Sequence, residues 1–259
     1  SAPNSTHRTT ASISLIADAL RDPDLSTRAT LRYSPSPNEL QKAAFAERYI
    51  EFGRPADALR WLQGDWGGQE PNRERLLADV YAALGDKARL QSIRQVIFER
   101  SGAAEDFRAW HEALDPALRE NAKALARTRA LKSDDPIIGA QLFLSIGDEA
   151  AAESLLIDRH QDIRGEHYYA LVPLAEMLAA QGRTLAAIAC YRALLVAILA
   201  RGYAPAYHHG ADYFRELRRL DATRPSYRDL PPHTEFEAAI RAKHGRKSSF
   251  WRQVASRGG

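Results

Sequence analysis

The chain has 259 residues, a formal net charge of +3 and one cysteine, Cys190. This length is enough for one large or two ordinary domains with a hydrophobic core, and so small a net charge does not by itself indicate a polyanionic partner. A single cysteine excludes an internal disulfide. Because Cys190 falls in the apolar run AAIACYRALLVAILA, we expect a buried thiol in a cytoplasmic protein.

Neither a leader nor a membrane span is expected. The first residues, SAPNSTHRTT, have no apolar core after their charge, so they do not form a signal peptide. The longest nearly uncharged run, residues 184–200, is broken by Arg192 and falls short of the roughly 20 apolar residues of a membrane-spanning helix. Since the only methionine is Met177, we expect the sequence to be a piece of a longer protein.

Residues 1–35 are expected to form an N-terminal segment, partly disordered, with one short helix. STHRTT is polar and disorder is expected there, whereas ASISLIADALRDPD can form the helix. The motif SPNE then predicts a helix start, with Ser36 as the N-cap, Pro37 at the first helical position and Glu39 at the capping-box position.

Residues 36–202 are expected to form an array of helical hairpins. Four segments run from a helix through a glycine and a polar residue into a second helix; they are YIEFGRPADALRWL, VYAALGDKARLQSI, LFLSIGDEAAAESLL and MLAAQGRTLAAIACYRALL. Their glycines, Gly53, Gly85, Gly147 and Gly182, are 32, 62 and 35 residues apart, and LDPAL at residues 114–118 stands where a further turn is expected. Five hairpins at this spacing are typical of helical solenoids.

Local residue choices support this arrangement. Glycine ends a helix because it accepts a left-handed backbone without a Cβ penalty, and Ala58, Ala152 and Ala187, five positions later, let paired helices approach. Asp135 and Pro136 predict another N-cap and first helical position. Because no run alternates apolar and polar residues between turn signals, no strands are expected and the predicted class is all-α.

In the last hairpin, Gly182, Ala187 and Tyr191 match the small, small and aromatic positions of the tetratricopeptide repeat, and residues 38–202 resemble that family. The resemblance implies antiparallel helix pairs stacked into a right-handed α-solenoid, whose concave face often holds a peptide or a partner protein. We therefore expect such a solenoid, capped by C-terminal helices.

Residues 203–259 are expected to form these capping helices and a basic, aromatic tail. One long helix is predicted to end before Pro225, SYRDLPP is a loop, and HTEFEAAIRAKHG is a final helix stopped by Gly245. From residue 215 to 259 there are 11 Lys/Arg and 5 Asp/Glu, a local charge of +6.

About residues 185–254, including the ending GRKSSFW, resemble the C-terminal part of an uncharacterised bacterial helical family. Its members end in a basic cluster followed by Phe-Trp, and some are joined to a SWIM-type zinc finger. The zinc-finger cysteines are missing here, so the nucleic-acid association of that finger is not implied.

Signatures of catalysis are missing from the sequence. It has no phosphate-binding glycine loop, nucleophile elbow, dinucleotide fingerprint or zincin motif, so we expect no enzyme and no cofactor. His208 and His209 would point about 100° apart on a helix and are poorly placed to share an ion, so we expect no metal site. One of them is expected to pack or cap, and the other to be exposed.

Several aromatic residues have two possible roles. Trp61, Trp66 and Trp110 can clamp a peptide or fill gaps between repeats, and packing is the favoured interpretation. The segments ERYIEF and HYYALV line either the core or a groove, and the sequence does not separate these two cases.

The candidate partner-binding residues are Arg215, Arg219, Arg246, Lys247 and Trp251. Cations beside a stackable aromatic residue suit an acidic peptide or single-stranded nucleic acid. In the competing interpretation, which we favour, the cations complement helix C-termini while the aromatic residues cover the open end of the last hairpin.

The expected function is that of a non-catalytic, protein-binding helical-repeat scaffold or adaptor. Its expected partner is a protein or peptide segment, with no membrane. The alternative is a nucleic-acid-associated protein that binds through the basic C-terminal end.

Overall fold

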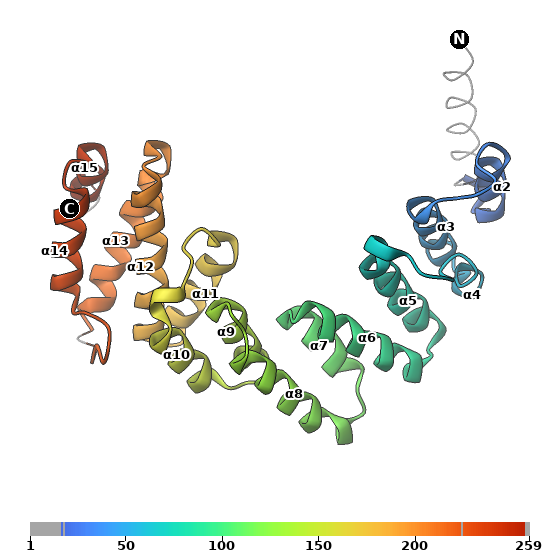
Figure 1. Cartoon of the computed structure of the whole chain (residues 1–259), viewed down its shortest axis with the longest axis horizontal. Helices are drawn as coiled ribbons and strands as arrows, with labels where there is room; N and C mark the ends of the chain where they lie inside the picture. Colours follow the sequence, from blue (N-terminus) through green and yellow to red (C-terminus); the bar gives the residue numbers. More distant parts are fainter. Residues whose placement is uncertain (1–16, 18, 224, 257–259) are drawn as a thin grey trace, which may run out of the picture. The chain divides into compact units, whose positions relative to one another are not determined.

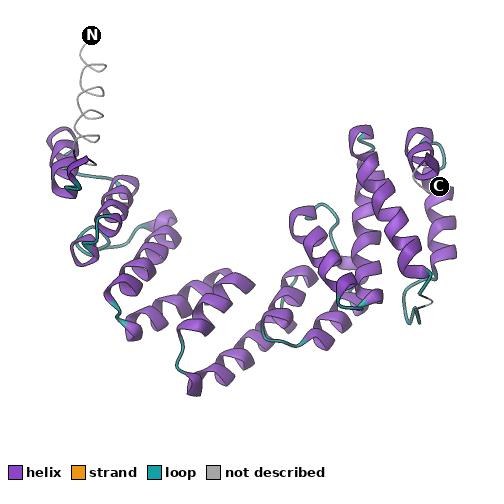
Figure 2. Ribbon diagram, turned by 180° about the vertical axis from the view of Figure 1, so that it is seen from behind, coloured by secondary structure: helices purple, strands orange, loops and turns teal. Residues whose placement is uncertain are grey.

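The computed structural model describes residues 17, 19–223 and 225–256. These residues form helices joined by short loops, without a strand among them (Figure 2), which confirms the all-α class. The α-helices, labelled in Figure 1, are α2 (Pro23–Tyr33), α3 (Glu39–Glu51), α4 (Pro55–Ala58), α5 (Glu70–Leu84), α6 (Lys87–Ser101), α7 (Ala104–Ala113), α8 (Arg119–Leu131), α9 (Pro136–Ser145), α10 (Glu149–Asp158), α11 (Tyr168–Ala180), α12 (Thr184–Arg201), α13 (Tyr207–Asp221), α14 (His233–His244) and α15 (Ser248–Ser256).

The chain divides into two compact units. Among the described residues, unit 1 consists of residues 17, 19–102 and 106–116. Unit 2 consists of residues 103–105, 117–223 and 225–256. LDPAL, the expected extra turn, separates α7 from α8 at the end of unit 1. The expected divisions after residues 35 and 202 stay predictions.

The glycine turns form as expected. Gly53, Gly85, Gly147 and Gly182 all have φ between 68° and 79°, the left-handed region in which a side chain would be strained. Each of the four separates two helices of one unit, and the three alanines five positions after Gly53, Gly147 and Gly182 are completely buried. The helix–glycine–helix prediction is therefore confirmed at these four turns.

Of the two predicted helix starts, one is correct and one is wrong. Asp135 caps α9, where its Oδ1 accepts from the backbone N–H of Ile137 at 2.8 Å. The start at Ser36 is wrong, because α3 begins at Glu39 and its N-cap is Asn38. Asn38 forms a capping box with Gln41. The two hydrogen bonds of this box fix the helix start after Asn38, although Pro37 favours an earlier start.

Helix α2 was not expected. The predicted helix in ASISLIADALRDPD lies mostly outside the described residues, as does the predicted disorder of STHRTT. Asp22 caps α2 by accepting from the backbone N–H groups of Asp24 and Leu25, and Pro23 occupies the first helical position. This Asp-Pro signature is the same as that of α9, and it could have been read from the sequence.

Unit 1 is held together by aromatic packing. Trp66 is buried in a core cluster with Tyr49, and the ring of Trp61 meets Phe45 edge to face at a centroid distance of 4.9 Å. Trp110 is buried against Phe98 at 5.6 Å. All three tryptophans of unit 1 thus make packing contacts, as favoured from the sequence.

Helix α12 is the core helix of unit 2. It packs against α10, α11 and α13, and Cys190 at its centre is buried, which raises the pKa of the thiol to about 12. By length and apolar composition α12 is a candidate membrane span, contrary to the expectation from its sequence, and 61% of it is buried inside the structure. Arg192 is itself buried, and its Nη1 donates to the carbonyl of Pro231 at 2.8 Å, which ties the predicted loop to α12.

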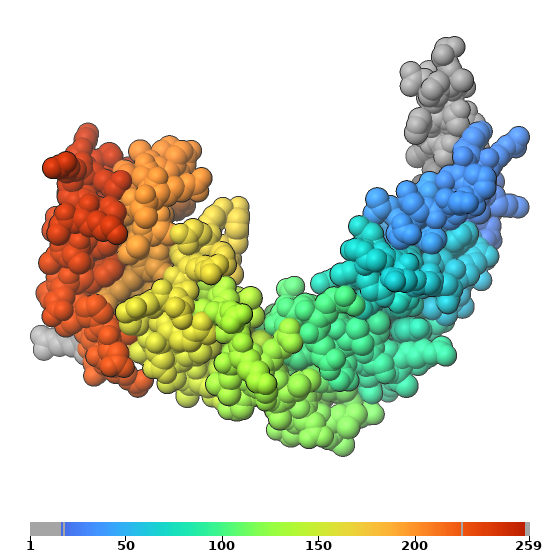
Figure 3. Space-filling model, in the orientation of Figure 1, coloured from blue at the N-terminus to red at the C-terminus, as the bar shows by residue number. Residues whose placement is uncertain are grey.

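The C-terminal tail is a helix instead of an extended arm. After α14 ends at His244, α15 begins at Ser248 and packs on α13, in the part of the chain coloured orange to red in Figure 3. Phe250 is completely buried, with its ring 5.9 Å from that of Tyr207 and 6.4 Å from that of Phe214. This helix was not predicted because it is short and follows a strong stop signal.

Candidate functional site

Arg215 and Arg219, two of the five expected binding residues, lie on the exposed face of α13. Arg215 Nη2 donates to Asp212 Oδ1 at 2.8 Å, and Arg219 grips Glu216 with bonds of 2.5–2.9 Å. The Glu216 bond raises the pKa of Arg219 above its usual value. Exposed pairs of this kind stabilise a fold by at most about 1 kcal/mol, so they do not commit the guanidinium groups to the fold.

Trp251 lies at the junction of α14 and α15 and is half-buried. Its Nε1 donates to the carbonyl of His244 at 3.1 Å, its ring meets Phe214 at 5.7 Å, and the Arg241 guanidinium sits 4.1 Å from the ring centroid. These contacts give Trp251 a packing role, as the competing interpretation expected.

Arg246 and Lys247 lie between α14 and α15. Arg246 is exposed, whereas Lys247 is half-buried with its Nζ 5.9 Å from the ring of Tyr207. Arg215 and Arg219 thus pair with carboxylates of their own helix, while the ammonium group of Lys247 lies over an aromatic ring of α13. Whether any of these residues binds a partner stays a prediction.

The two histidines are both exposed at the start of α13. The Nδ1 of His208 lies 2.7 Å from the carbonyl oxygen of Pro205, in the turn that leads into the helix, and the two imidazole rings are 3.9 Å apart. Across the described ranges, no group of three His, Cys, Asp or Glu side chains is placed to hold a metal ion.

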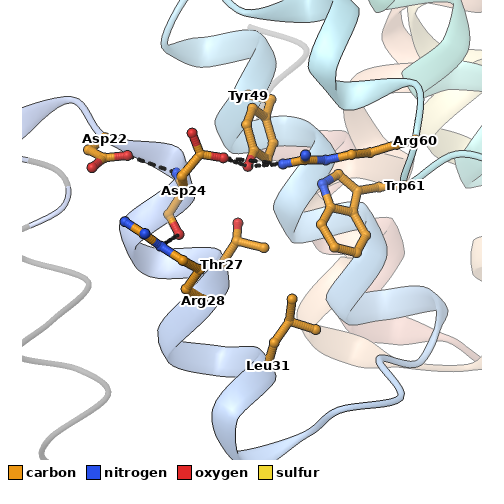
Figure 4. A pocket seen from close by; sticks show the side chains of 8 residues that line it. All are labelled: Asp22, Asp24, Thr27, Arg28, Leu31, Tyr49, Arg60 and Trp61. Carbon is orange, nitrogen blue, oxygen red and sulfur yellow. Dashed lines mark hydrogen bonds and ion pairs between the residues drawn. The ribbon is translucent and has the colours of Figure 1, made fainter.

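A pocket in unit 1 was not anticipated from the sequence. It has a volume of about 520 Å³ and lies where α2 meets the end of α3 and the turn after α4 (Figure 4). The side chains that line it are Asp22, Asp24, Thr27, Arg28, Leu31, Tyr49, Arg60 and Trp61.

Charged groups form a closed network along one wall of this pocket. The buried Tyr49 donates its hydroxyl to Asp24, and Arg54 and Arg60 add bonds to the same carboxylate at 2.7 and 3.2 Å. Arg60 also donates to the Tyr49 oxygen. The Tyr49 and Arg54 bonds together lower the pKa of Asp24 to about 2, whereas burial and the Asp24 bond raise that of Tyr49. Asp24 is therefore a carboxylate whose acceptor capacity is largely used within the protein.

Two other polar atoms of the pocket have no hydrogen-bond partner among the described residues. The hydroxyl of Thr27 and the indole N–H of Trp61 are both buried, and Thr27 is only 3% exposed. The Thr27 hydroxyl lies near that of Tyr49 and slightly offsets the rise in the pKa of Tyr49, but it does not complete a hydrogen bond. Buried polar groups are nearly always bonded, so these two atoms are available to a polar group that enters the pocket.

A second surface, in unit 2, comes from the HYYALV segment. Tyr168 is 46% and Tyr169 82% exposed at the start of α11, and their rings lie 4.1 Å apart. Arg201, at the end of α12, is close enough to Tyr168 to lower its pKa, although Tyr169 raises it more, and Arg201 stacks 5.6 Å from the ring of the 54% exposed Tyr203. We name Tyr168, Tyr169, Arg201 and Tyr203 the tyrosine–arginine surface.

Comparison with known proteins adds one match. A family model described as a family of unknown function (DUF6880) covers residues 4–253. It extends the expected likeness of the C-terminal part to an uncharacterised family over nearly the whole chain, and it shows neither a tetratricopeptide nor a SWIM-type domain. No curated protein and no solved structure matches the chain.

Proposed function

The chain belongs to this family of unknown function, and we propose that it is a non-catalytic, helical-repeat adaptor that binds a segment of a partner protein. The proposal includes the finer architecture, a solenoid of antiparallel hairpins similar to tetratricopeptide repeats. Four left-handed glycine turns, each followed by helices that pack on their chain neighbours, support that architecture.

The observation that carries the binding proposal is the tyrosine–arginine surface. Large aromatic side chains are normally covered, yet Tyr168, Tyr169 and Tyr203 are all about half exposed or more. Arg201 is a neighbour of Tyr168 and Tyr203, and Tyr169 packs against Tyr168. Tyrosine and arginine are enriched at protein interfaces, and they dominate the residues whose truncation costs most binding energy. Their rigid rings also lose little conformational entropy on binding.

Nucleic-acid binding through the basic end is the competing proposal, and the geometry supports it less. The one expected stacking residue, Trp251, already packs on Phe214 and bonds to the backbone. A single-stranded nucleic acid would need a free aromatic face beside the cations.

The test is capture of proteins from nuclease-treated lysate of the native host, followed by mass spectrometry. The baits are the whole chain, a Tyr168→Ser, Tyr169→Ser variant, and a control variant, Tyr33→Ser, which changes an exposed tyrosine of α2. We expect a protein retained by the whole chain and the control and lost at least about tenfold from the double variant, since truncation of interface tyrosines typically costs 1–2 kcal/mol or more.

Equal capture by all three baits would overturn the role of the tyrosine–arginine surface. A protein captured from untreated lysate and lost after nuclease treatment would favour nucleic acid. In that case, binding of a labelled single strand should weaken steeply with added salt and with Arg246→Glu, Lys247→Glu, because phosphate contacts release counterions.

A further inference from the structure

We propose that the pocket of unit 1 binds a carboxylate carried on an apolar stem, as a partner segment presents at its C-terminal residue or on an acidic side chain. This deepens the proposed function, on which the assignment of the ligand to a protein segment rests.

The space suits a side chain or a terminal residue. A volume of about 520 Å³ lies within the range of small ligand sites, 300–1,000 Å³. The lining comes from α2, from α3 and from the turn after α4, all within unit 1, so packing of that unit holds the walls (Figure 4).

The unsatisfied atoms require an acceptor. An indole N–H can only donate, so the buried Nε1 of Trp61 needs an oxygen, and the Thr27 hydroxyl can donate to the same group. In Figure 4 the nitrogen edge of Trp61 is turned toward Arg60 and Thr27. An ammonium or guanidinium ligand has no acceptor to offer either group, whereas a carboxylate offers about four acceptor sites.

The cations favour an anion over a neutral acceptor. Of the two aspartates that line the pocket, Asp22 accepts from two backbone N–H groups at the start of α2, and Asp24 is held by Tyr49, Arg54 and Arg60. Arg28 is exposed, and its Nε donates to the backbone carbonyl of Asp24 at 3.3 Å, which positions the guanidinium at the rim. A guanidinium has five N–H donors, so this single bond leaves a fork able to grip a carboxylate.

The remaining wall is apolar. Leu31 lies on the side of the pocket away from the Asp24 network (Figure 4). The ring of Trp61, 5.2 Å from the Arg60 guanidinium, adds apolar surface between them, and Phe45 meets this ring edge to face. A free inorganic anion would leave this wall uncovered. A carboxylate on a short hydrocarbon stem covers it and reaches the donors at the same time.

The test uses the whole chain labelled with ¹⁵N and follows the indole N–H signal of Trp61, assigned by its loss in Trp61→Phe. The probes are N-acetyl-leucine for a terminal carboxylate, N-acetyl-glutamic acid α-amide for a side-chain carboxylate, and N-acetyl-leucinamide as the neutral analogue. We expect at least one carboxylate to shift the signal to saturation below about 50 mM, as for a fragment with a Kd near 1 mM. The neutral amide should not saturate it.

The matched variants are Arg28→Gln, at the rim, and Arg32→Gln, an exposed arginine of the same helix that does not line the pocket. Arg28→Gln should weaken carboxylate binding roughly tenfold, because it removes a charge-assisted bond, and Arg32→Gln should change it less than about twofold. An unmoved Trp61 signal with both carboxylates, or equal shifts with the neutral amide, overturns the proposal.

The two proposals fail separately. If the probes bind but no protein is captured from lysate, the pocket proposal is supported and the adaptor function is contradicted. If a partner is captured and the probes do not bind, the adaptor function is supported and the pocket proposal is contradicted.

Discussion

Tyr49 in unit 1 and the pair Tyr168 and Tyr169 in unit 2 are the same residue type in similar helical segments, yet their environments are opposite. Tyr49 is completely buried and its hydroxyl is bound by Asp24 and Arg60, whereas Tyr169 is 82% exposed. The difference follows from what covers each segment. Helix α2 and the turn after α4 bring polar partners to Tyr49, while Tyr168 and Tyr169 begin α11 beside an exposed arginine. A tyrosine is part of the fold where other helices cover its ring, and available for binding where its ring is exposed.

The sharpest test of this contrast is truncation of the buried ring. Tyr49→Ala should lower the free energy of unfolding by about 3–5 kcal/mol, the usual cost of removing a large buried aromatic side chain. Urea unfolding followed by tryptophan fluorescence reports on the stability of unit 1, because Trp61, Trp66 and Trp110 all lie in that unit. A cost below about 1 kcal/mol would contradict the structural role of Tyr49.

A smaller effect should come from the hydroxyl alone. Tyr49→Phe keeps the ring and removes the donor to Asp24, so we expect a loss of about 1–2 kcal/mol in the same urea experiment. Tyr33→Phe, on the exposed face of α2, is the control and should be neutral. If both variants behave alike, the hydrogen-bond network does not stabilise unit 1.

The pH dependence of stability tests Asp24, which accepts the hydrogen bond from Tyr49. The bonds from Tyr49 and Arg54 lower the pKa of Asp24 from its usual 3.8 to about 2. The folded protein therefore gains stability from the Asp24 carboxylate above about pH 4 and loses it as the pH falls toward 2. Thermal melts over this range should show the whole chain losing more stability than Asp24→Asn. Parallel curves would mean that Asp24 is not preferentially charged in the folded state.

The smallest expected effect is on the exposed side of the comparison. Tyr169→Ala should change the free energy of unfolding by less than about 0.5 kcal/mol, as for surface substitutions away from packed features. The same variant should lose the protein captured by the whole chain. Destabilisation comparable to that of Tyr49→Phe would show that Tyr169 supports the fold, and the binding proposal would lose its main support.

Features set by a few consecutive residues could be predicted from the sequence. The four glycine turns, the cap of α9 by Asp135 and the end of α14 at Gly245 were all predicted correctly. The start of α3 shows the limit, since Ser36 and Asn38 are both good caps and only the backbone decides between them. Local bonds choose these boundaries, and local sequence contains most of the information.

The sequence by itself determined that this protein is all-α, where most hairpins turn, and that the unit 1 tryptophans pack. Only the tertiary structure decided which aromatic residues are covered, that α15 buries Phe250, and that a pocket exists at all. The physical reason is the sequence separation of the contacts: Asp24 meets Tyr49 across 25 residues and Arg60 across 36. Such contacts depend on how helices pack, which no local pattern specifies.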